Sequence, residues 1–145
     1  MNEKLKDLIL AGECEKAQEI TDNLTYDELD ALLTDIAFSE HSLAVYTFTQ
    51  HLLLQDETIQ LHEMAFELLV HPLCHLPGAY FSALYHARRC ITLAEPEELK
   101  HYLTYLLFLH EVPDKVVGEQ EALAAAKRIL ELNPNSEVAQ KYRGS

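Results

Sequence analysis

The sequence AYFSALYHARRCITLAEP, residues 79–96, carries a stripe of small side chains along one face of an expected helix. Its small residues recur every three or four positions, at Ala79, Ala83, Ala87, Cys90 and Ala94. That spacing keeps them on one helical face, where small side chains let a neighbouring helix approach closely. Pro96 follows and cannot continue the helix interior. We therefore expect a helix over residues 78–94 that packs tightly against its neighbours.

A second stripe of the same kind lies about forty residues further along the chain. It consists of Ala122, Leu123, Ala126, Ile129 and Leu130, and Pro134 follows it. Both stripes combine a closely packing face with a proline that ends the helix. Two such segments in one chain indicate helices stacked on one another.

The composition favours helix almost throughout. The chain has 145 residues, of which 48% are apolar, with only four glycines and five prolines. Leu and Ala are strong helix formers, whereas the β-branched residues of a sheet are sparse. A chain of this length buries roughly 70% of its unfolded surface in one core. We expect one all-α domain over residues 1–145.

Local signals place the turns between helices. Gly12 is expected to end the first helix, because glycine readily adopts the left-handed conformation of a C-cap. Thr25-Tyr-Asp-Glu28 is a capping box, in which the Thr25 hydroxyl accepts from the amide of Glu28 and the Glu28 carboxylate accepts from the amide of Thr25. Pro72 and Pro77 predict a break over residues 71–78.

Ser39 is expected to be the N-cap of a helix over residues 40–54. Its predicted core residues are Leu43, Val45, Tyr46, Leu52 and Leu53. Gln55 or Asp56 is expected to open the next helix, and later helices are expected over residues 97–110 and 137–142. The total is eight or nine helices with short turns. Short turns force antiparallel neighbours, so we expect helical hairpins stacked as a short α-solenoid.

The two stripes resemble the second helices of tetratricopeptide-type repeats. The matching residues are Ala83, Ala87, Cys90 and Pro96 in the first, with one extra residue before the proline, and Ala122, Ala126, Ile129 and Pro134 in the second. Residues 11–17, AGECEKA, resemble the turn inside such a repeat. Residues 78–143 are thus the repeat-like part, and residues 1–75 are less regular. The resemblance implies a degenerate helical-repeat protein that binds peptides or proteins and is not an enzyme.

The chain is strongly acidic, with a net charge of −13. Residues 1–40 carry eleven acidic and three basic side chains, whereas residues 112–145 carry five of each. Such a surface repels phosphate backbones, so direct nucleic-acid binding is disfavoured, and it attracts basic partners. The candidate partner-binding residues are Glu15, Glu19, Asp22, Asp27, Asp30 and Asp35.

The chain is expected to lie in the cytoplasm. Its three cysteines have no disulfide-framework spacing, which favours a reducing compartment. The first ten residues are charged where a signal peptide needs an apolar run. The longest apolar run, residues 102–109, is too short to span a bilayer, so no membrane association is expected.

A metal site is the sharpest chemical alternative. His71, Cys74 and His75 lie close together in the sequence, and imidazole and thiolate ligands suit zinc. Tetrahedral zinc needs four converging ligands, and this spacing is not a standard ligand motif, so these residues are better explained as loop residues. Phosphate-binding loops and catalytic motifs are absent, which argues against an enzyme and against a cofactor.

Three functions remain open. Size, acidity and the lack of catalytic motifs are similar to bacterial immunity proteins, which neutralise a basic toxin, often a nuclease, by covering its active site. The second reading is a tetratricopeptide-like adaptor that holds a peptide or a partner protein's tail in a groove. The third is a metal-binding regulatory protein.

Overall fold

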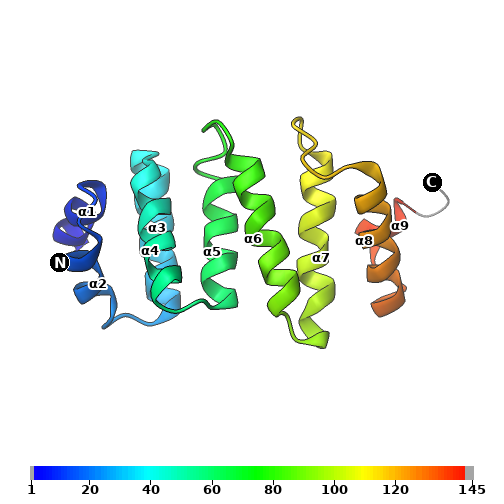
Figure 1. Cartoon of the computed structure of the whole chain (residues 1–145), viewed down its shortest axis with the longest axis horizontal. Helices are drawn as coiled ribbons and strands as arrows, with labels where there is room; N and C mark the ends of the chain where they lie inside the picture. Colours follow the sequence, from blue (N-terminus) through cyan, green and yellow to red (C-terminus); the bar gives the residue numbers. More distant parts are fainter. Residues whose placement is uncertain (1, 143–145) are drawn as a thin grey trace. The chain divides into compact units, whose positions relative to one another are not determined.

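A computed structural model describes residues 2–142, and over that range the chain is all-α, with nine helices and no strand. The helices are labelled in chain order in Figure 1. They fall into two compact units, Met1–Ala79 and Tyr80–Ser145. The all-α class confirms the prediction from composition, and nine helices within residues 2–142 agree with the eight or nine predicted from the turn signals. The prediction that residues 1–145 form one domain stays a prediction.

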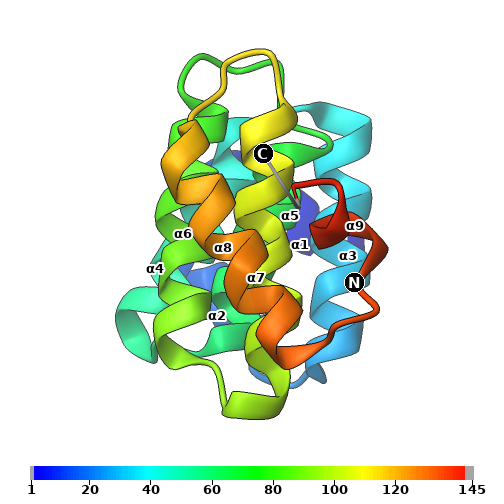
Figure 2. The same ribbon diagram turned by 90° about the vertical axis from the view of Figure 1, so that its right-hand side faces the viewer.

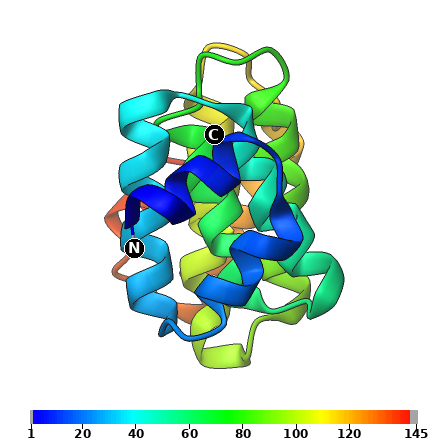
Figure 3. The same cartoon turned by 90° about the vertical axis from the view of Figure 1, so that its left-hand side faces the viewer.

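The first unit holds five helices. They are α1 (Asn2–Leu10), α2 (Cys14–Thr21), α3 (Tyr26–Glu40), α4 (Leu43–Gln55) and α5 (Ile59–Val70). The helix α4 is central to this unit, because α1, α2, α3 and α5 all pack against it. The helix α1 also packs against α2, and α3 against α5. Figure 3 shows α1 and α2 nearest the viewer, with α3 and α4 behind them.

The second unit holds four helices among the described residues. They are α6 (Ala79–Leu93), α7 (Pro96–Glu111), α8 (Glu119–Leu132) and α9 (Glu137–Gln140). The helix α7 packs against α8, and both contact the short α9. Figure 2 shows α8 running across α7 with α9 beside them. Near the end of the described chain, the Tyr142 hydroxyl donates to the Glu111 carboxylate of α7. Burial and this hydrogen bond raise the pKa of Tyr142 to about 12.

Most residues of the two alanine stripes are buried, whereas Ala94, Leu123 and Leu130 are half-buried. Their most enclosed members are Ala79, Ala83, Ala87, Cys90, Ala122, Ala126 and Ile129, each at most 4% exposed. Larger side chains at these positions would have kept the neighbouring elements further apart. The prediction that the small residues line a packed face is therefore confirmed.

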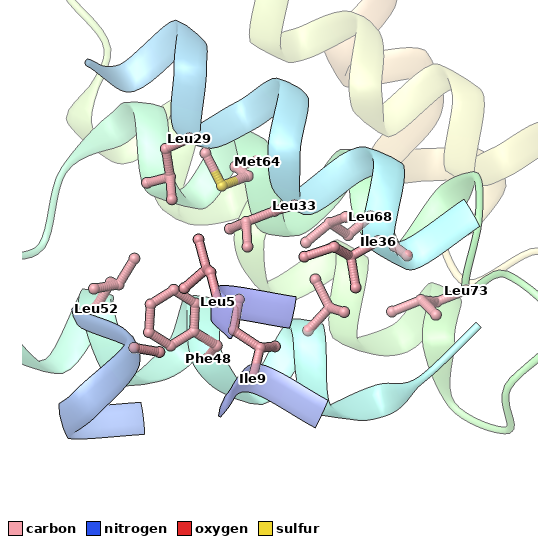
Figure 4. Packing of buried hydrophobic residues seen from close by; sticks show 13 residues of the cluster. Leu5, Ile9, Leu29, Leu33, Ile36, Phe48, Leu52, Met64, Leu68 and Leu73 are labelled. Atoms are coloured by element: carbon pink, nitrogen blue, oxygen red, sulfur yellow. The ribbon is translucent and has the colours of Figure 1, made fainter. Parts of the chain in front are cut away.

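The core of the first unit draws on all five helices. Figure 4 shows the ring of Phe48 from α4 against Leu5 and Ile9 of α1, with Leu33 of α3 and Leu68 of α5 in the same cluster. All five side chains are at most 1% exposed. This cluster fixes α3 and α5 next to each other and so positions the surface described below.

The predicted turn signals at Gly12 and Thr25 are confirmed. Gly12 has a φ of 79°, in the left-handed region that favours glycine. Thr25 caps α3 through the predicted box: its hydroxyl accepts from the Glu28 amide at 3.1 Å, and its own amide donates to the Glu28 carboxylate at 2.9 Å. The break over residues 71–78 is also present.

Loss of the Thr25 cap should have a measurable effect on stability. Thr25→Ala leaves an N-terminal amide of α3 without its side-chain acceptor, and we expect the free energy of unfolding to fall by about 1 kcal/mol. Thr47→Ala is the control, because Thr47 is exposed within α4 and caps no helix. Urea titrations followed by far-UV circular dichroism compare the two variants. Equal losses in both would contradict the assigned role of Thr25.

The predicted start of α4 is wrong. Ser42, not Ser39, is its N-cap, and the Ser42 hydroxyl accepts from the Ala44 amide at 3.1 Å. Ser39 instead lies in the last turn of α3 and donates to the Ile36 carbonyl. The helix α3 ends at Glu40, and its C-cap, His41, takes a left-handed conformation with φ 52°. Both serines can cap a helix, and the position of this left-handed residue selects the later one.

The buried face of α4 also differs from the predicted one. Val45, Phe48, Thr49 and Leu52 are buried at helical spacing, whereas the predicted core residue Leu43 is 55% exposed. Tyr46 and Leu53 are only half-buried. The helix α5 likewise begins later than predicted, at Ile59, because the Thr58 hydroxyl caps it by accepting from the Leu61 amide. No helix in the described range is long and apolar enough to cross a membrane.

Candidate functional site: the acidic face of α3 and α5

Two helices of the first unit bring four carboxylates into one region. The helix α5 is buried around most of its circumference, and Glu63 and Glu67, one turn apart, are its half-buried acidic residues. The helix α3 packs against α5 and contributes Asp27 and Asp30. We call the four residues Asp27, Asp30, Glu63 and Glu67 the acidic face. Their positions follow from the core, because the opposite sides of both helices are apolar and buried.

Asp30 lies at the centre of this region. Partial burial raises its pKa above the ordinary value of 3.8, and the nearby charges of Glu63 and Asp27 raise it further. Burial and like charge both disfavour the ionised carboxylate. Asp30 is therefore in an electrostatically unfavourable setting that a cation would relieve.

Glu67 is in a similar setting. Burial raises its pKa above 4.5, and the charges of Glu63 and Asp30 act in the same direction. His71 opposes them, because its Nε2 lies 3.0 Å from a Glu67 carboxylate oxygen. The net direction is still upward, so the histidine does not compensate for burial and the neighbouring acids.

These helices supply no strong cation of their own. The sequence contains no lysine or arginine from position 17 to position 87, although it has eleven acidic residues there. The two lysines nearest in sequence are paired with acids outside the acidic face: Lys6 with Glu40, the last residue of α3, at 2.9 Å, and Lys16 with Glu13 at 3.2 Å. Histidine is therefore the only basic residue type along α3, α4 and α5.

The predicted partner-binding residues separate into two groups. Asp27 and Asp30 belong to the acidic face, and Asp35 is exposed further along α3. Glu15 and Glu19 are exposed on α2, and Asp22 follows at its C-cap. Sequence reasoning missed Glu63 and Glu67. Their spacing of four residues on an otherwise apolar helix was the available signal, since an apolar helix keeps its acids on one narrow exposed strip.

Neutralising Asp30 should stabilise the protein at neutral pH. Because the folded-state pKa is raised, ionised Asp30 disfavours folding above that pKa, and the penalty disappears below about pH 3.8. Asp30→Asn should therefore raise the free energy of unfolding by a few tenths of a kcal/mol at pH 7, a small gain because the site is solvent-screened. The gain should vanish near pH 3 and shrink in 1 M salt.

Asp35→Asn is the matched control for this experiment, since it removes the same charge from an exposed position of the same helix. Thermal unfolding at pH 7 and pH 3 measures both variants. A loss of stability in Asp30→Asn at pH 7 would contradict the electrostatic assignment.

The predicted metal candidates lie at and after the end of α5. His71 pairs with Glu67, Cys74 is exposed, and the ring of His75 packs edge-on against His41 with centroids 5.5 Å apart. The Nδ1 atom of His41 is 3.3 Å from the Pro72 carbonyl oxygen. Within residues 2–142, no group of three or more His, Cys, Asp or Glu side chains is arranged to hold a metal ion.

Comparisons with known proteins leave the assignment to the residues themselves. No protein-family model matches the chain, and neither the curated proteins nor the solved structures gave a significant match. The acidic face, together with the lysine- and arginine-free segment that carries it, is thus the feature on which a functional proposal has to stand.

Proposed function

We propose that this protein is a non-catalytic binding module for a basic protein, and most concretely an acidic immunity protein that neutralises a toxin. The observation that carries the proposal is the acidic face, where Asp30 and Glu67 have raised pKa values on helices without lysine or arginine. A lysine or arginine from a partner would supply the counter-charge that these helices lack. It would also relieve the repulsion between the neighbouring carboxylates.

The overall charge supports the same kind of partner. A net charge of −13 steers a basic protein toward the surface and raises its association rate at low salt. Complementary charge also rejects acidic partners, because like charges across an interface cost several kcal/mol. Selectivity for a basic domain follows from the charges alone.

The mechanism is occlusion. A standard protein interface of about 1,600 Å² covers roughly 800 Å² on each partner, which is enough to cover the active site of a small toxin domain such as a nuclease. A nuclease active site is basic around the phosphate-binding region, so an acidic inhibitor competes with the substrate for the same charges. No chemical step by this chain is required.

The fold supplies a rigid base for such a surface. The buried alanine stripes of α6 and α8 support the proposal that the helical hairpins stack as a short, tetratricopeptide-like α-solenoid. Proteins of that architecture present extended surfaces made of successive helices, and the acidic face would be one part of that surface.

Isothermal titration against the product of the adjacent gene tests this function. Binding of a folded basic domain with a nanomolar dissociation constant, together with loss of that domain's toxic activity, is the expected result. Micromolar binding to a peptide alone would instead support the adaptor, which the buried small-residue stripes also suit. Stoichiometric zinc in protein purified without a histidine tag would favour a metal-binding regulator.

A further inference from the structure

A recess of about 340 Å³ lies at one end of the first unit. It is formed where the turn between α2 and α3 meets the turn between α4 and α5, and Figure 1 shows both turns at the same end of these helices. Its apolar lining comes from four leucines, of which Leu29 and Leu52 are buried and Leu24 and Leu61 are half-buried. The recess is small for a cofactor but adequate for one long side chain, since ligand pockets span roughly 300–1,000 Å³.

The walls of the recess are held by internal hydrogen bonds. The Tyr26 hydroxyl donates to the Gln60 carbonyl at 2.7 Å and so ties α3 to the start of α5. The Gln18 side-chain oxygen accepts from the Nε2 of His51 at 2.7 Å, which ties α2 to α4. Thr25 and Thr58 use their hydroxyls to cap α3 and α5. These bonds make the recess preformed, which lowers the cost of ordering it on binding.

Two carboxylates of the recess take no part in these internal hydrogen bonds. Asp22 and Asp56 both line the recess, and neither side chain forms a hydrogen bond or ion pair with any described residue. The carboxamides of Gln55 and Gln60 also line it, and neither has a hydrogen-bond partner within the described part of the chain. Among residues 2–142, no lysine or arginine lines the recess. It therefore combines an apolar lining with acceptor groups and two negative charges.

We propose that this recess takes the guanidinium group of an arginine side chain on the surface of the basic partner. The inference rests on the proposed function, because it assigns one anchor of the expected interface. The aliphatic stem of arginine would lie along Leu24, Leu29 and Leu61, and its charged head would meet Asp22 and Asp56. A guanidinium presents five donors in a planar fork, which fits two carboxylates and neighbouring carboxamides.

Lysine is the less suitable occupant. Its ammonium is a compact and strongly hydrated charge with three donors, so it loses more hydration and satisfies fewer acceptors. Arginine is also enriched among the residues that dominate binding energies at protein interfaces. We therefore expect the recess to prefer arginine over lysine through donor geometry and hydration, since both side chains carry one positive charge.

Blocked amino acids test the inference on the whole chain without a partner. ¹⁵N-labelled protein is titrated with N-acetylarginine amide and with the corresponding lysine and citrulline compounds. We expect the arginine compound to shift amide signals around residues 22–29 and 52–61, with a dissociation constant of about 1–10 mM. The lysine compound should bind several-fold more weakly. Citrulline, which has the same shape without the charge, should give no saturable shift.

Substitutions test whether Asp22 and Asp56 are the carboxylates that bind the guanidinium group. Asp22→Asn combined with Asp56→Asn should weaken the arginine compound at least about fivefold, since it removes both carboxylates at nearly constant volume. The control pair, Asp7→Asn with Asp35→Asn, removes the same charge from exposed positions outside the recess and should change affinity less than twofold. The citrulline comparison uses the unaltered protein and holds even if a variant fails to fold.

Several results would overturn the inference. They are equal shifts with arginine and citrulline, unchanged affinity in the Asp22 and Asp56 variant, or shifts centred outside the recess. Tighter binding of free L-arginine than of the blocked form would also overturn it, because an arginine within a protein has no free carboxylate. If the recess fails these tests while a basic partner still binds, only this inference falls. If arginine binds as predicted and no basic protein does, the proposed function falls.

Discussion

Phe48→Ala is expected to lower the free energy of unfolding by about 3–5 kcal/mol. Phe48 is fully buried, and its ring lies in one cluster with Leu5 and Ile9 of α1 (Figure 4). Truncation removes the apolar transfer energy of the ring and leaves a cavity that the surrounding helices fill only in part. Since α4 contacts the other four helices of its unit, the loss should be felt throughout that unit.

Leu54→Ala is the matched control, because Leu54 lies on the same helix with 86% of its surface exposed. Its effect should stay within about 0.5 kcal/mol. Urea unfolding followed by circular dichroism gives the free energy of unfolding of both variants, and the dependence of that free energy on urea concentration should be the same in both. A loss below about 1 kcal/mol for Phe48→Ala, or an equal loss for Leu54→Ala, would contradict the placement of α4.

Ala126→Leu is expected to cost about 1–3 kcal/mol, although leucine is an excellent helix former. Ala126 is 2% exposed on α8, which packs against α7 and α9. Three added carbon atoms have no space in a close-packed interface, so the helices must separate or the side chain must leave its preferred rotamer.

Ala124→Leu serves as the control, because Ala124 is exposed two residues earlier on the same helix. The substitution is chemically identical, and its cost should be near zero. Thermal unfolding followed by circular dichroism at 222 nm gives the melting temperatures of the Ala126→Leu and Ala124→Leu variants. Equal melting temperatures would show that the small residues of this stripe are not needed for close packing.

Much of the fold could be read from local sequence signals. The capping box of Thr25 and Glu28, the left-handed Gly12 and the prolines of residues 71–78 each have one favourable conformation, so their structural outcome depends little on distant residues. The alanine stripes were equally informative, because small residues at helical spacing have few roles other than close packing.

The wrong predictions for α4 have a common cause. Two residues were equally suited to the same role by local sequence, and tertiary packing decided between them. Ser39 and Ser42 are equally good N-caps, and only the left-handed turn at His41 selects Ser42. Leu43 and Phe48 are both apolar, but packing of α4 against the other helices of its unit buries Phe48 and leaves Leu43 half-exposed. Neither choice can be made from propensity alone.

The candidate sites were likewise predicted only in part, because the sequence identifies single acidic residues but not which of them meet in space. The sequence singled out Asp27 and Asp30, but their neighbours Glu63 and Glu67 are more than thirty residues away and meet them only because α3 packs against α5. Asp22 was singled out on a helix face of like charges. Its position beside Asp56 in one recess depends on two turns that meet in space.

The most direct test of the proposed function is the affinity for a basic partner measured with two charge-matched triple variants. Asp27→Asn, Asp30→Asn and Glu67→Gln together remove three of the four charges of the acidic face, whereas Asp7→Asn, Glu97→Gln and Glu98→Gln remove three exposed charges outside it. Isothermal titration at 150 mM salt should show at least about tenfold weaker binding for the first variant and less than threefold for the second. Equal affinities of the two variants, or no binding of any basic domain by the unaltered protein, would contradict it.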